Sequence, residues 1–283
     1  MTEREITISK IELGKYKIPT IIQKIKNYIS TNNLYDFFGF RLTFDFRYNI
    51  TPLDIVPFAY TGGNGIHFGF LTDFGLVNSL DDAPIVIIAP TYDPPIRLVA
   101  KNLLDFLTYF PTMYDAEDLL IDDINMLNKS SNERWDRYTE EQVRIEKHNF
   151  SKLVNDYRMQ FEGTKLSSAE EILENIEKIR KSRKLVVNIE TADNVGLVTN
   201  LLNTENSNIS QFDYSIADVK IIENYLETAN KNSRIMFYRD ATYMYILSKD
   251  YDYEVLGVLK KWLKIDGFLR ESEVINILDG SIT

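Results

Sequence analysis

The stretch that decides the fold is Leu53-Asp-Ile-Val-Pro-Phe-Ala-Tyr-Thr-Gly-Gly-Asn-Gly-Ile-His-Phe-Gly-Phe-Leu-Thr-Asp73. Its centre, residues 61–65, holds three glycines and an asparagine, which are residues that tolerate the positive φ angles of tight turns. Beyond the turn, Ile66, Phe68 and Phe70 alternate with other residues, the two-residue period of a strand with one apolar face. We therefore expect a β-hairpin, which specifies a scaffold and no particular reaction.

The segments on either side of this hairpin predict an α+β domain with a mainly antiparallel sheet and flanking helices. Residues 18–29 place four isoleucines on one helical face. Residues 42–50 alternate apolar and polar side chains, as in a strand with one solvated face, and residues 84–89 predict a buried strand. Asp-Pro-Pro at residues 93–95 suits the first turn of a helix, and the apolar spacing continues that helix to residue 110.

The chain beyond this domain predicts a second, more helical α+β region. We place the boundary so that the domains are residues 1–113 and 114–283. Capping boxes at residues 139–142 and 168–171 each begin a helix, the first of them running to about residue 161. The other expected elements are a strand at residues 185–189, a short helix capped by Asp193, a helix opening at residues 215–218, a hairpin of residues 235–239 and 242–248, and a helix at residues 253–264.

Composition narrows the classes of partner. Of the 283 residues, 42 are Asp or Glu and 32 are Lys or Arg, which gives a net charge of −10. This acidity disfavours nucleic acid and anionic membranes, which require a basic face, and favours a basic protein partner. The chain has no cysteine, and no apolar run approaches membrane-spanning length. We expect a soluble protein of the reducing cytoplasm that binds neither nucleic acid nor membrane.

Motifs for catalysis or cofactor binding are missing from the sequence. The glycines at residues 63–69 have the wrong spacing for a dinucleotide fingerprint and lead into a strand. There is no phosphate-binding loop, no G-x-S-x-G elbow and no H-E-x-x-H pair, and the two histidines, His67 and His148, stand far apart. We therefore expect a protein that is not an enzyme and that holds no cofactor and no metal.

Three features keep alternative interpretations open. His67 is either a polar contact to a partner or a histidine on the wet side of the sheet or hydrogen-bonded under a loop, and we favour the second interpretation. The acids at residues 115–123 either steer a basic partner or form a solvated helix start. The string Asp250, Asp252 and Glu254 either binds a divalent metal in an enzyme or begins the last predicted helix, and we favour the helix start.

Residues 55–70 resemble the central hairpin of the SUKH superfamily, which has a strand ending in a Pro-Phe-like step, a Gly-Gly-Asp/Asn-Gly turn and an aromatic strand. Residues 84–89 and 96–107 are similar to the strand and closing helix of that family, with its Phe-Leu pair, and residues 12–19 to its opening helix. The resemblance extends over about residues 10–110. The usual aspartate of the turn is Asn64 here.

The resemblance implies a binding module without catalytic residues. Bacterial SUKH proteins are typically immunity proteins that neutralise toxins, often nucleases, by direct binding, whereas fungal relatives regulate cell-wall synthesis and signalling. We therefore expect a cytoplasmic immunity protein whose partner is a basic protein toxin, and the alternative is an intracellular scaffold or regulator of cell-wall or signalling proteins. Asn64, His67 and Asp73, in and around the hairpin, are the predicted partner contacts.

Overall fold

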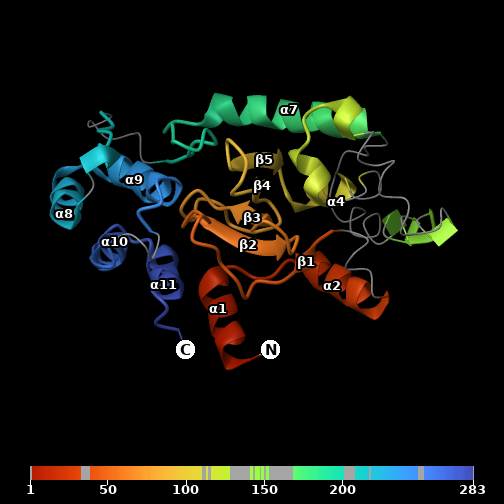
Figure 1. The fold of residues 1–283 in the computed structure, drawn as a ribbon, viewed down its shortest axis with the longest axis horizontal. Helices are drawn as coiled ribbons and strands as arrows, with labels where there is room; N and C mark the ends of the chain where they lie inside the picture. The colour runs from red at the N-terminus through yellow and green to blue at the C-terminus, as the bar shows by residue number, and fades with distance from the viewer. Residues whose placement is uncertain are drawn as a thin grey trace.

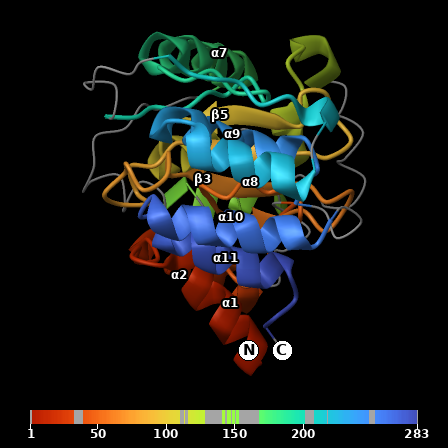
Figure 2. The same ribbon diagram turned by 90° about the vertical axis from the view of Figure 1, so that its left-hand side faces the viewer.

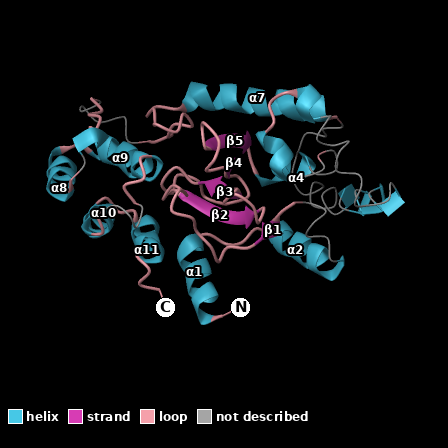
Figure 3. Cartoon of the chain, viewed as in Figure 1, coloured by secondary structure: helices cyan, strands magenta, loops and turns pink. Residues whose placement is uncertain are grey.

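The computed structural model of the chain has an α+β fold in which one antiparallel sheet lies among helices (Figure 1, Figure 3). The structure describes residues 2–32, 39–109, 113, 116–127, 141–142, 144–146, 148–149, 151–152, 168–200, 208–216, 218–247 and 252–282. The helices are α1 (Glu3–Leu13), α2 (Thr20–Asn32), α4 (Leu103–Tyr109), α7 (Ala169–Val186), α8 (Val219–Thr228), α9 (Lys231–Tyr243), α10 (Glu254–Ile265) and α11 (Leu269–Leu278), with short 3-10 turns η1 (Ala116–Leu120) and η4 (Tyr214–Ile216).

The predicted hairpin forms the centre of the sheet. Each strand runs antiparallel to the next in the order β1-β2-β3-β4-β5. In the hairpin, Ile55 pairs with Leu71 and Tyr60 with His67, and a bulge interrupts the register between Pro57 and Ala59. The strands are β1 (Arg41–Leu42), β2 (Ile55–Tyr60), β3 (His67–Leu71), β4 (Ile85–Ile88) and β5 (Ile96–Ala100).

The two faces of the sheet belong to separate apolar clusters. Alternate apolar residues of β2 to β5 pack with α2 and α4 on one face, and the intervening residues form a second cluster on the other. Helix α7 crosses the open edge of β5, since Ile172 and Ile176 join the first cluster while Ile179 joins the second. Arg180 of this helix donates from Nε to the carbonyl of Leu98 at 3.0 Å, which satisfies one backbone group of the edge strand.

The four C-terminal helices, α8 to α11, stand beside the sheet around a third cluster (Figure 2). Leu53 and Phe74, which flank the two ends of the hairpin, belong to this cluster. Helix α11 packs on α1, and Arg4 donates to the carbonyl of Ile282 at 3.2 Å, so the two ends of the chain lie together. All three clusters contain residues from both sides of position 113, so the predicted boundary does not separate two cores.

Two predictions for the first half are wrong. Residues 43–50 form no strand, because this segment folds inward to place Arg47 beside Glu12 and Thr51 beside His67. Every residue of β3 and β4 is buried, so the buried strand predicted at residues 84–89 is confirmed, and β3 is covered on both of its faces. Residues 96–100, predicted as helix, form β5, and only residues 103–109 are helical. A short apolar run fits either structure, and pairing with β4 decides it.

In the second half, the predicted helices that begin at Ser168 and Asp218 are confirmed, as is the helix near residues 253–264. The helices α9 and α11 were not predicted from the sequence. Helix α7 continues through Val186 in place of the expected strand, and Asp193 caps no helix. Residues 235–243 belong to α9 and form no strand, because that helix is buried on nearly all sides and shows no polar stripe. Most of the helix predicted at residues 139–161 lies outside the described residues. Neither α1 nor α11 was predicted.

Candidate functional site

The turn of the central hairpin lies on the surface. Gly62, Gly63 and Asn64 are exposed, and φ is 89° at Gly62, 50° at Asn64 and 68° at Gly65. A Cβ at Gly65 would approach the Pro90 ring to 3.2 Å, so this position is restricted by space as well as by φ. The predicted contact Asn64 is therefore available to a partner.

His67 lies directly beneath this turn and is fully buried. Its Nδ1 is 2.7 Å from the carbonyl of Gly65, and its Nε2 is 2.8 Å from the hydroxyl of Thr51. Because a carbonyl can only accept, Nδ1 carries the proton and Nε2 accepts from Thr51. Burial lowers the pKa of His67 to about 4, against the hydrogen bond to Gly65, which raises it. The ring is therefore neutral at pH 7 and holds the turn in place.

Aromatic rings surround His67 and continue to the surface. The Phe46 ring packs edge-on against Tyr48, Tyr60 and His67, with centroids 5.7, 5.1 and 5.9 Å away. Tyr48 is 38% exposed and Tyr245 is 56% exposed, and together with Pro90 they line a shallow hollow of about 430 Å³. We call the exposed residues Tyr48, Asn49, Gly62, Gly63, Asn64 and Tyr245 the hairpin surface.

Asp73, the third predicted contact, lies at the other end of the hairpin and is buried. Its two carboxylate oxygens accept from Arg183 of α7 at 2.8 and 2.6 Å. Arg183 also donates to the carbonyls of Val195 and Gly196, so this pair ties α7 and the loop of residues 187–196 to the sheet. His67 is fully buried and Asp73 is only 7% exposed and bound to Arg183, so neither side chain is presented to a partner, and we replace both as contact residues.

A second buried arginine joins the base of the hairpin to the C-terminal helices. Arg239 of α9 donates to Asp54 at 2.6 Å and to Asp193 at 2.5 Å, and all three side chains are buried. Burial raises the pKa of the Asp54 carboxyl, whose Oδ2 has no hydrogen-bond partner among the described residues. Burial also acts to raise the pKa of Asp193, but Arg239 and hydrogen bonds from Thr191 and Val195 lower it below its usual value. With two acids and one base, Asp54 is the carboxyl more easily protonated.

The segment that leads into β2 is held by a third ionic cluster. The Glu12 carboxylate accepts from Arg47 at 2.6 and 2.8 Å and from Arg270 of α11 at 3.3 Å. Both arginines also donate to backbone carbonyls of residues 51–55. These donors satisfy carbonyls that no strand pairs, and they fix the entry into the hairpin.

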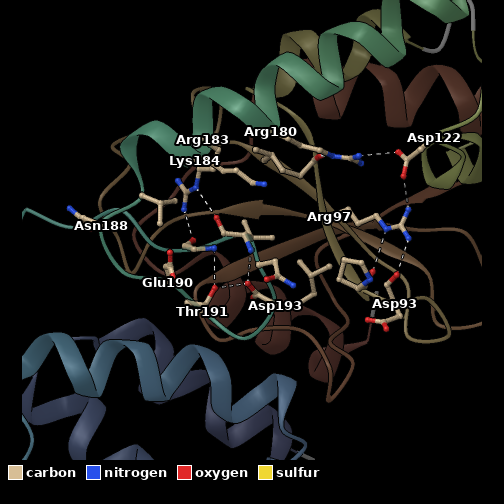
Figure 4. A pocket seen from close by; sticks show the side chains of 17 residues that line it. Asp93, Arg97, Asp122, Arg180, Arg183, Lys184, Asn188, Glu190, Thr191 and Asp193 are labelled. Atoms are coloured by element: carbon tan, nitrogen blue, oxygen red, sulfur yellow. Dashed lines mark hydrogen bonds and ion pairs between the residues drawn. The ribbon is translucent and has the colours of Figure 1, made fainter. Parts of the chain in front are cut away.

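A polar cleft opens beside α7 (Figure 4). It has a volume of about 930 Å³ and lies between α7, the start of β5 and the loop of residues 187–196. Arg97 from β5 and Arg180 from α7 meet there on one carboxylate, that of Asp122, at 3.1 and 2.9 Å. Ile96, Leu98, Val187 and Val195 supply apolar walls.

The remaining acidic candidates are dispersed. Asp115 and Asp250 lie outside the described residues, and Asp118 is buried. Asp123 accepts from the backbone N–H groups of Asn125 and Met126, as at a helix start, and Asp252 accepts from that of Glu254. Within the described ranges, no group of three or more His, Cys, Asp or Glu side chains could hold a metal ion, and no helix is long and apolar enough to cross a membrane.

Sequence reasoning missed the buried arginines and the cleft. Arg183 and Arg239 each sit among residues that read as ordinary surface or strand positions, and Asp54 lies 185 residues from Arg239. The basic run at residues 180–184 is a weak signal, because such a run at the end of a helix is also explained by the helix dipole.

A scan of the chain against models of known protein families finds no match, and no curated protein matches it either.

Proposed function

We propose that the chain is a non-enzymatic binding protein of the cytoplasm, an immunity protein that neutralises a basic protein toxin by direct binding at the hairpin surface. The observation that carries the proposal is the exposed turn beside two partly exposed tyrosines, presented by the hairpin that resembles that of SUKH proteins. Asn64 is exposed at the turn, and Tyr48 and Tyr245 line the hollow beside it.

The chemistry of this surface suits a protein partner. Tyrosine is enriched at the energetic centres of interfaces, because it supplies a large apolar area and a polar end at low cost in side-chain entropy. The turn is fixed from below by His67, so little further ordering is needed on binding. The net charge of −10 favours rapid association with a basic partner through long-range steering.

Affinity capture tests the proposal. The purified full chain is used as bait for lysate and secreted fraction of its source cells, with a high-salt wash, and bound proteins are identified by mass spectrometry. A basic polypeptide with a toxin domain, whose toxicity is suppressed when the bait protein is co-expressed, is the expected result. Recovery of cell-wall or signalling proteins in its place would favour the scaffold or regulator alternative.

Two matched variants locate the surface. Asn64→Gly with Tyr245→Ser removes both side chains while glycine keeps the positive φ of position 64, and it should weaken binding about tenfold or more. Ile216→Ser is the control, because Ile216 is 54% exposed, close to the 56% of Tyr245, but lies next to α8; this variant should leave binding unchanged. Equal affinity of the double variant and the wild type would remove the hairpin surface from the proposal.

A further inference from the structure

The cleft beside α7 contains two arginines that share one carboxylate. Arg97 and Arg180 reach the same carboxylate from different elements, and that carboxylate, Asp122, is 57% exposed and belongs to the irregular segment of residues 121–123 (Figure 4). An exposed carboxylate on such a segment can move into solvent at small cost. The two guanidinium groups are therefore held in place by the fold, whereas their anion is replaceable.

Two further donors remain unused at this wall. The Nη2 atom of Arg180 is buried and has no hydrogen-bond partner among the residues described. Lys184 lies one helical turn from Arg180 and also lines the cleft, and its ammonium group forms no hydrogen bond or ion pair with any other described residue. A buried donor without an acceptor is unfavourable, so a second acceptor atom at this place would improve the site.

The other arginine of the cleft provides an internal contrast. All three nitrogen atoms of the Arg183 guanidinium group donate to Asp73 and to the carbonyls of Val195 and Gly196, so Arg183 has a structural role and no donor left for a ligand. The remaining carboxylates of the lining that have no such partner, Asp93 and Glu190, form no ion pair with Arg97, Arg180 or Lys184 in the described part of the chain. Arg97 also uses all its nitrogen atoms, on Asp122 and on the carbonyls of Asp93, Pro94 and Leu120. The donors without a partner in the described part of the chain are therefore Nη2 of Arg180 and the ammonium group of Lys184, both on α7.

We propose that this cleft binds a small organic anion whose phosphate or carboxylate group replaces Asp122 between Arg97 and Arg180 and is also contacted by Lys184. Planar guanidinium groups match the oxygen atoms of both kinds of anion. The volume of about 930 Å³ is in the range of small-molecule sites, and Ile96, Leu98, Val187 and Val195 would contact an apolar or ring-shaped body. This site is separate from the hairpin surface and holds whether or not the partner there is a toxin.

Calorimetric titration of the full chain at low salt tests the site with three probes. Phenyl phosphate and benzoate represent the two sources of the anion, and benzyl alcohol is the uncharged control. Saturable binding of either anion with a Kd below about 1 mM, without binding of the alcohol, is expected, and the anion that binds identifies the class. The proposal would be overturned if neither the wild type nor Asp122→Asn bound an anion saturably. It would also be overturned if benzyl alcohol bound as tightly as the anions.

Variants give effects of opposite sign. Arg180→Met and Lys184→Met should each weaken anion binding about tenfold. Asp122→Asn should tighten it severalfold, because it removes the carboxylate that competes for the same guanidinium groups. Lys181→Met, on the same helix but paired outward with Glu177, is the control and should change nothing. Since Lys184 is exposed, its variant keeps the test valid even if Arg180→Met fails to fold, and unchanged affinity in Lys184→Met together with Asp122→Asn would refute the site.

Discussion

Replacing Arg239 by methionine tests the buried charge cluster at the base of the hairpin. The guanidinium group is fully buried between Asp54 and Asp193, at 2.6 and 2.5 Å. Methionine fills much of the same volume, so the main effect is to leave two buried carboxylates without a positive partner. Breaking a buried ion pair in this way typically costs about 3–5 kcal/mol, because the remaining charge is uncompensated.

The loss in unfolding free energy caused by Arg239→Met depends on pH, because each carboxylate left without its positive partner can take up a proton instead. For an acid with an ordinary pKa of about 3.9, protonation at pH 7 costs about 4 kcal/mol, and at pH 5 about 1.5 kcal/mol. This cost is a ceiling on the penalty that each unpaired carboxylate imposes. The loss caused by Arg239→Met should therefore shrink by about 2–3 kcal/mol for each neutralised carboxyl between pH 7 and pH 5.

Urea unfolding followed by circular dichroism at pH 7 and pH 5 measures both quantities. Lys261→Met, which breaks an ion pair to Glu223 between two half-exposed side chains, is the matched control and should shift the unfolding midpoint far less. If the Arg239 variant is unfolded at pH 7, it should regain structure at pH 5. A loss below about 1 kcal/mol at pH 7, or an equal loss at both pH values, would refute the reasoning.

Three further predictions rest on single buried residues. Because the pKa of His67 is lowered to about 4, its ring resonance should stay unshifted in an NMR titration from pH 8 to pH 5, with His67→Gln used for assignment; a midpoint near 6.5 would contradict its burial. The neutral ring then supplies stability that is complete above pH 6.5 and is lost as the pH falls toward 4, by roughly 3 kcal/mol in total. Burial raises the pKa of Asp240 to about 6, so ionisation of this carboxyl reduces the stability of the fold as the pH rises from 4 through 6. In urea unfolding, Asp240→Asn should therefore be more stable than the wild type by about 1–3 kcal/mol at pH 7, but not at pH 4. Gly69→Ala should lose about 1–3 kcal/mol or more by the same assay, because a Cβ there would lie 2.2 Å from Cγ2 of Ile55, and a loss under 0.5 kcal/mol would show that β2 and β3 adjust easily.

Local sequence signals predicted the elements whose structure is decided locally. The hairpin has its turn residues and its two-residue period within one stretch, and α2 and α10 show a clear apolar stripe. Helix α9 was missed because nearly all its residues are buried, and a helix buried all round has no periodicity to detect. The strand β5 was missed because its apolar residues suit a helix equally well, and the decision comes from β4.

The candidate site was predicted only in part for a related reason. Asn64 is exposed because it lies in a turn, which is a local property, whereas the environments of His67 and Asp73 depend on what the rest of the chain places over them. Thr51 and the aromatic rings cover His67, and Arg183, which is 110 residues away, covers Asp73. No spacing rule in a single sequence connects residues so far apart.

The buried groups at the two ends of the hairpin have different structural roles. At its base, Asp54 and Asp73 are each bound by an arginine from a different helix, and Arg47 and Arg270 bind the segment that enters β2. Because Arg183, Arg239 and Arg270 lie on α7, α9 and α11, their buried contacts fix the direction of the hairpin relative to these helices. His67 then fixes the turn relative to the strands. A binding surface that is already ordered loses little entropy on association. Under the proposed function, variants of Asp54, Asp73 or their arginines should therefore weaken partner binding by displacing the turn, although these side chains are buried away from the hairpin surface.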